Sequence, residues 1–120
     1  MGKKGLLLCV CQGTCPSFQD MNIFEVGNAI RRAKLVDYAA VHPQLCAEDG
    51  DEFLSSLLDG GSTGTLYVAG CAPNMMRKMY RDAFDAAGFD PANFRGVEIR
   101  DMNTEQAITA IKDLIAQDNA

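Results

Sequence analysis

Residues 65–88 read TLYVAGCAPNMMRKMYRDAFDAAG, and they contain the strand-then-helix unit that decides the fold of this chain. Residues 65–69 are rich in β-formers and predict a strand, and Pro73 suits the first turn of a helix. Apolar residues then recur at a spacing of three and four, which predicts a helix that ends at Gly88. The expected apolar face of this helix consists of Met75, Met76, Met79, Tyr80, Ala83, Phe84 and Ala87.

The same unit recurs on both sides of this stretch. Residues 6–10 form a continuous apolar run that predicts a short, central, buried strand. Residues 36–41 predict a strand at the edge of the sheet, because Pro43 stops the pairing just beyond it. Residues 94–99 predict a fourth strand.

Helical patterns follow each of these strands and carry start or stop signals. We expect Asp20 to cap the helix after the first strand. Gly60 and Gly61 are expected to end the helix after the second. Asn103 and Gln106 resemble a capping box for the last helix. The expected apolar positions are Ile23, Val26, Ile30 and Ala33 in the first helix, Phe53, Leu54, Leu57 and Leu58 in the second, and Ile108, Ile111, Leu114 and Ile115 in the last.

Strands and helices that alternate four times with short connections predict an α/β fold with right-handed crossovers. The simplest arrangement is a flavodoxin-like three-layer sandwich, in which a four-stranded parallel sheet of order 2-1-3-4 has helices on both faces. No linker or internal repeat interrupts the pattern. We therefore expect residues 1–120 to form a single domain.

Composition limits the function classes. The chain has 120 residues, of which 48% are hydrophobic, enough for a core without disulfide support. The formal net charge is -5, and no run of lysine and arginine is interleaved with aromatic residues, so nucleic acid is not an expected partner. The apolar run 6–10 is too short to span a membrane and lacks a small-residue cleavage site. We expect a cytoplasmic protein.

Five cysteines fall at the ends of the first three predicted strands. They are Cys9, Cys11, Cys15, Cys46 and Cys71. The carboxyl ends of parallel strands lie along one edge of a sheet, so these thiols are expected to meet there. In a reducing cytoplasm such a cluster indicates metal ligands or catalytic thiols rather than disulfides.

An iron-sulfur cluster suits this edge for an electrostatic reason. A 4Fe-4S cluster held by four thiolates is an anion, and the N-termini of the helices point at the same edge. Gly13, Gly50 and Gly70 stand beside the cysteines and could let backbone amides approach the cluster sulfurs. The sequence therefore predicts metal binding by the five cysteines, with these glycines as cofactor-binding residues.

Several alternatives use the same residues. Tetrahedral zinc or a cluster with fewer irons is chemically acceptable at these thiolates. Cys11 and Cys15 could serve a thiol-redox or sulfur-carrier role, because a helix N-terminus stabilises a thiolate. Free cysteine also fills space in cores, and Cys9 is the residue most open to that interpretation. The loop CQGTCPS is similar to that of low-molecular-weight phosphatases and arsenate reductases, but Pro16 replaces the arginine that such chemistry needs.

His42 and three basic residues of the helix after the third strand are each expected to have an ordinary structural role. We expect His42 to be an ordinary loop residue, although it could bind a metal or carry a proton. The basic residues Arg77, Lys78 and Arg81 are most simply the solvated side of their helix, and docking of an acidic redox partner is the alternative.

Three segments together resemble the N-terminal iron-sulfur domain of the large, flavin-containing polypeptide of heterodisulfide reductase and its relatives. They are CVC at 9–11, HPQLCAEDG at 42–50 and LYVAGCAPNMMRKMYRDAFDAAGFDPANFRGVEIRD at 66–101. The resemblance implies a domain that holds one iron-sulfur cluster within a flavin-containing electron-transfer system of anaerobes. No glycine fingerprint for FAD is present in this chain. The resemblance thus implies a non-catalytic electron-transfer component whose partners are flavin- or iron-sulfur-containing reductase subunits.

The resemblance also implies a set of ligands, namely Cys9, Cys11, Cys46 and Cys71. The family usually has a further cysteine soon after the isoleucine-arginine-acid triplet at 99–101, where this chain has Met102 and Asn103. Cys15 stands where the family commonly has no cysteine. Which four of the five cysteines bind is therefore open.

Overall fold

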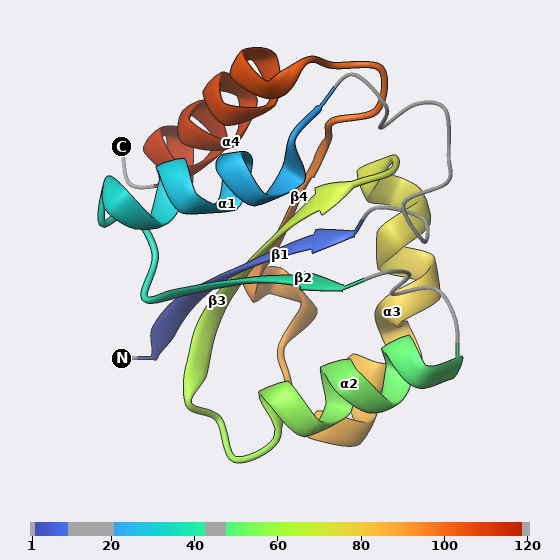
Figure 1. The fold of residues 1–120 in the computed structure, drawn as a ribbon. Coiled ribbons are helices and arrows are strands. Elements are labelled where there is room, and N and C mark those ends of the chain that lie inside the picture. The colour runs from blue at the N-terminus through green and yellow to red at the C-terminus, as the bar shows by residue number, and fades with distance from the viewer. Residues whose placement is uncertain (1, 10–20, 43–47, 119–120) are drawn as a thin grey trace.

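A four-stranded parallel sheet forms the middle layer of the computed structural model, which describes residues 2–9, 21–42 and 48–118 (Figure 1). The strands are β1 (Lys3–Cys9), β2 (Tyr38–His42), β3 (Thr63–Gly70) and β4 (Phe94–Glu98). Their order in the sheet is β2-β1-β3-β4, and all three neighbouring pairs are parallel. The predicted strand order and three-layer α/β architecture are confirmed.

Helices cover both faces of this sheet (Figure 1). One face carries α1 (Ile23–Arg32) and α4 (Thr104–Asp118), and the other carries α2 (Glu48–Leu58) and α3 (Pro73–Ala87). A 3-10 helix, η3 (Pro91–Asn93), follows α3 and was not predicted. Across the part of the chain that the structure describes, no helix has both the length and the apolar character needed to cross a membrane.

Alternation along the central strand β1 divides the core into two halves. Leu6 and Leu8 pack among the residues under α1 and α4, whereas Leu7 and Cys9 pack among those under α2 and α3. All of these side chains are buried because neighbouring strands pair with both edges of β1 and helices cover both faces. The continuous apolar run in the sequence is thus the signature of a strand with no exposed face.

The strand bounds differ from the predicted ones by a few residues. The first strand starts three residues earlier than predicted, at Lys3, and residue 10 lies outside the described residues. The second runs from Tyr38 to His42, and Val36 is buried before it begins. The fourth ends at Glu98 rather than at 99. Pairing with the neighbouring strand sets these limits, and the β-propensity of the residues alone does not predict where that pairing begins and ends.

The helix caps were predicted in part. The side chains of Asn103 and Gln106 each accept a hydrogen bond from the other's backbone N–H, at 2.8 and 2.9 Å, so the capping box is confirmed. Gly88 ends α3 with φ of 70°, the left-handed conformation that glycine adopts without strain. The cap predicted for α1 was wrong: Asn22, not Asp20, is its N-cap and accepts from the N–H of Glu25 at 3.2 Å.

Two positions expected in apolar helix faces are exposed. Ala33 lies just past the end of α1 as its C-cap. Met75 is 51% exposed in the first turn of α3, where the buried side chain next to it, Met76, faces the core. The apolar face of α3 is therefore narrower than predicted and is centred on Met76, Tyr80 and Phe84.

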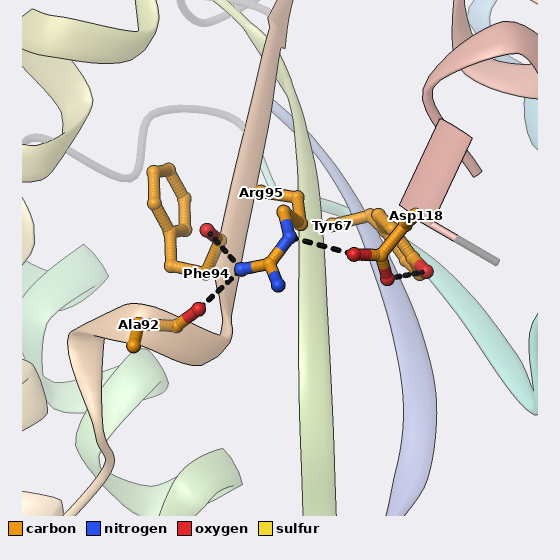
Figure 2. Close-up of polar contacts among 5 residues, drawn as sticks. All are labelled: Tyr67, Ala92, Phe94, Arg95 and Asp118. Atoms are coloured by element: carbon orange, nitrogen blue, oxygen red, sulfur yellow. Dashed lines mark hydrogen bonds and ion pairs between the residues drawn. The ribbon is translucent and has the colours of Figure 1, made fainter. Parts of the chain in front are cut away.

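A polar cluster fastens the end of α4 to the sheet (Figure 2). Tyr67 and Arg95 are opposite each other on β3 and β4. Tyr67 Oη donates to one carboxylate oxygen of Asp118 at 2.7 Å, and Arg95 Nε donates to the other at 2.8 Å. Arg95 Nη1 also donates to the carbonyls of Phe94 and Ala92. Asp118 is thereby held by hydrogen bonds from two strands.

These contacts shift the ionisation of both acidic groups. Burial, and then the hydrogen bond to Asp118, raises the pKa of Tyr67. The hydrogen bond from Tyr67 is the main cause that lowers the pKa of Asp118, and Arg95 lowers it further while partial burial opposes the shift. Both shifts therefore favour the pairing of a neutral phenol with a carboxylate at neutral pH.

We predict that Asp118→Ala lowers the free energy of unfolding by about 2 kcal/mol at pH 7, because it removes two hydrogen bonds to a carboxylate and leaves the buried Tyr67 hydroxyl without this acceptor. The folded pKa of Asp118 lies below its unfolded value, so its contribution is present above about pH 4 and is lost as the pH falls through the folded pKa. Urea unfolding at several pH values measures both effects.

The exposed Asp113 on the same helix provides the matched control. Asp113→Ala should change the unfolding free energy by less than about 0.5 kcal/mol. A difference between wild type and Asp118→Ala that persists undiminished at pH 2 would contradict the electrostatic origin of the effect.

Candidate functional site

The carboxyl ends of the four strands form a continuous row of residues. Cys9 at the end of β1 is paired in register with His42 at the end of β2. Gly70 at the end of β3 is paired with Glu98 at the end of β4. The row therefore runs His42, Cys9, Gly70, Glu98 in the order of the sheet.

Two predicted thiols lie at this edge within the described residues. Cys9 is 4% exposed and belongs to the hydrophobic cluster under α2 and α3. Cys71, one residue beyond β3, is partly buried and packs against the same cluster. Thiols that are distant in the sequence thus share one side of the sheet. Burial of this degree suits both a core residue and a ligand shielded from water.

Gly70 allows β3 to pass close to Cys9. A Cβ atom at Gly70 would lie 3.1 Å from the carbonyl oxygen of Cys9 and 3.2 Å from its Cβ. The carbonyl of Gly70 in turn accepts a hydrogen bond from the N–H of Ile99 at 3.0 Å. Backbone on both sides therefore fixes Gly70, and a side chain at this position would press directly on the residue that carries the buried thiol.

The guanidinium of Arg100 lies at the β4 end of this row of strand-end residues. Arg100 donates to one carboxylate oxygen of Glu98 from Nε at 2.9 Å and from Nη2 at 2.6 Å. The hydrogen bonds and charge of Glu98, with a smaller contribution from Cys71, raise the pKa of Arg100. Arg100 thus stays positively charged within electrostatic reach of Cys71.

The N-terminus of α3 adds further positive potential next to Cys71. Ala72 is the N-cap of this helix and supplies no side-chain hydrogen bond to its first turn. The first N–H groups of a helix carry the positive end of its dipole and bind anions. The N-terminus of α3 therefore favours negative charge next to Cys71, and the ion pair of Arg100 with Glu98 lies at the same edge.

His42 is not the loop residue that the sequence suggested. It is the last residue of β2, is 8% exposed, and packs on the ring of Phe53 in α2 with the ring centroids 5.0 Å apart. The prediction failed because the strand continues to the residue directly before Pro43 instead of ending at Val41. Alternation offered a usable signal, since Ala40, two residues earlier, faces the same helices.

Sequence reasoning also missed Glu98 and Arg100 as parts of this edge. Their signal was their position at the end of the fourth predicted strand, the same criterion that singled out the cysteines. Charged residues are common at strand ends, so the pattern alone did not distinguish them from solvated surface.

Of the other predicted site residues, only Gly50 falls within the described ranges. Gly50 is buried in the first turn of α2. Residues Cys11, Gly13, Cys15 and Cys46 lie outside the described ranges. Within those ranges, no three side chains of histidine, cysteine, aspartate or glutamate are grouped to hold a metal ion. The described residues supply two thiols of the predicted site, Cys9 and Cys71.

No protein-family model matches this chain, and a search of curated proteins finds no significant match. The resemblance to the N-terminal domain of the flavin-containing polypeptide of heterodisulfide reductase stays a prediction.

We predict that Gly70→Val lowers the free energy of unfolding by about 1–3 kcal/mol, because its side chain would be forced against the backbone of Cys9. Chemical denaturation measures this change. Gly27→Ala is the control: its added methyl would meet only the end of the Leu8 side chain, at 3.2 Å, and alanine favours the helix. Equal losses from the two substitutions would contradict the special constraint at Gly70.

Proposed function

We propose that this chain is an iron-sulfur protein that binds one 4Fe-4S cluster at the carboxyl edge of its sheet and passes single electrons between protein partners. The observation that carries the proposal is the placement of Cys9 and Cys71, which come from the ends of adjacent strands and pack against one hydrophobic cluster. Four-iron clusters are held by cysteine thiolates. Two thiols on one side of the edge are consistent with half of such a ligand set.

The surroundings of the two thiols suit an anionic group. The start of α3 favours negative charge beside Cys71, and the guanidinium of Arg100, which is paired with Glu98, lies at the same edge. The burial of Cys9 would keep water from its sulfur, which matters because solvent exposure and net charge tune the reduction potential of a cluster. These are properties of the protein chain and are present before any cofactor binds.

The remaining ligands in this proposal come from Cys11, Cys15 and Cys46, as the resemblance to the reductase domain implies. A bound cluster would supply a one-electron couple, and no substrate bond would be made or broken at this site. The partners would be flavin- or iron-sulfur-containing components of a heterodisulfide-reductase-like system in the cytoplasm. The resemblance supports this assignment of partners.

The metal content of the protein tests the proposal. We expect about four irons and about four acid-labile sulfides per chain after anaerobic purification or reconstitution. A paramagnetic resonance signal should appear on reduction with dithionite. Cys9→Ser and Cys71→Ser should each lose most of the iron.

Ala40→Ser is the matched control, because Ala40 packs against the same cluster as Cys9 and the substitution adds a hydroxyl without removing a thiol. This variant should retain its iron, and circular dichroism should show that all three variants fold. Protein that stays free of iron after anaerobic reconstitution would refute the proposal. Binding of zinc alone would replace it with a structural metal site.

We predict in addition that Arg100→Gln lowers the reduction potential of the loaded protein. The reduced cluster carries more negative charge than the oxidised one, so loss of a nearby cation disfavours reduction. A potentiometric titration followed by paramagnetic resonance measures the shift. Arg31→Gln, on the exposed end of α1, should leave the potential unchanged. Equal potentials for wild type and Arg100→Gln would contradict a role for this cation.

A further inference from the structure

One flank of α3 carries three cations around an apolar hollow. Arg77, Lys78 and Arg81 line a cavity of about 310 Å³, and its other walls are Phe84 and Pro91. Phe84 is 1% exposed, so it forms the floor of the cavity while the three basic side chains stand around it in solvent. The cavity therefore combines an apolar interior with a positively charged rim.

The cations of this rim are not neutralised by the described part of the chain. Arg77, Lys78 and Arg81 are exposed, and none of them forms an ion pair with a described acidic residue. The guanidinium of Arg77 lies 5.8 Å from the centroid of the Phe94 ring, a cation–π contact that holds it beside the start of β4. By contrast, Arg95 and Arg100 are both paired with carboxylates.

Two of the acidic residues near α3 lie outside this basic flank. Asp82 lines a separate groove with Asp51 and Glu52 of α2. The carboxylate of Asp90 accepts the N–H of Ala92 at 3.0 Å and caps η3. Asp85, four residues after Arg81 on α3, is exposed on the same side of the helix, so this flank carries three cations and one carboxylate in a chain of net charge -5. An acidic partner would be repelled by most of this protein and attracted to that flank, which orients the encounter.

We propose that the flank formed by Arg77, Lys78, Arg81, Phe84 and Pro91 is the docking site for an acidic segment of a partner protein. An apolar side chain of that segment would occupy the cavity, and neighbouring carboxylates would pair with the three cations. The inference does not depend on a metal at the carboxyl edge of the sheet.

The observations favour a protein segment over two other anions. Nucleic acid binding requires a larger basic surface than three cations on an acidic protein. A small inorganic anion would gain no favourable contact from the apolar surfaces of Phe84 and Pro91. The cavity volume is at the lower end of the range for ligand pockets, about 300–1,000 Å³, which suits a side chain better than a large cofactor.

The test uses a fluorescein-labelled polyglutamate peptide with two central leucines and the 120-residue chain. Fluorescence anisotropy should detect saturable binding that weakens as salt rises to about 0.5 M. The triple variant Arg77→Gln, Lys78→Gln, Arg81→Gln should bind at least about tenfold more weakly. Exchanging both leucines of the peptide for serine should also weaken binding, because the cavity then stays unfilled.

The control variant removes the three exposed cations at the end of α1. The triple change Arg31→Gln, Arg32→Gln, Lys34→Gln alters the net charge equally and should change affinity less than twofold. Amide shifts in a nuclear magnetic resonance titration should cluster on residues 77–84 and 92, since Pro91 has no N–H, and should be the same whether or not metal is loaded. Absence of binding, equal losses in both triple variants, or tighter binding of an oligonucleotide than of the peptide would overturn the proposal.

Discussion

The central position of β1 constrains most of this structure. A strand that is paired on both edges and covered on both faces has no side turned to water, so β1 is apolar at consecutive positions and leads directly into a buried cysteine. Parallel pairing then aligns the ends of β2, β3 and β4 with that cysteine. The candidate site is therefore a consequence of how the sheet is assembled, and it needs no specialised loop to bring Cys9 and Cys71 to one side.

The two halves of the molecule are fastened in different ways. Toward the middle and start of the strands, the carboxylate of Asp118 joins α4 to Tyr67 and Arg95, so this half is held by directional polar contacts (Figure 2). At the carboxyl edge, the ion pair of Arg100 with Glu98 is accompanied by the close backbone approach of Gly70 to Cys9. The ion pairs depend on ionisation, whereas the approach of Gly70 depends on the absence of a side chain.

Local patterns predicted the parts of the fold that local physics determines. Asn103 and Gln106 bond to each other's backbone, so their capping box could be read from four consecutive residues. Asn22 was harder to predict, because its N–H also donates to the hydroxyl of Thr104, far away in the sequence, at 2.8 Å. The placement of Cys9 and Cys71 on one side of the sheet followed from the parallel topology. The electrostatic interaction of Arg100 with Cys71 could not be predicted in this way, because it depends on where the chain turns after β4.

The N-cap of α3 shows how stability and charge binding can conflict at one residue. Serine or aspartate at Ala72 would stabilise the protein by about 1 kcal/mol through a bond to the first turn of the helix. The same side chain would occupy N–H donors directly after Cys71 and, if acidic, would place a rival charge beside it. Selection for a more heat-resistant chain and selection for an anion at this edge would therefore favour different residues at position 72.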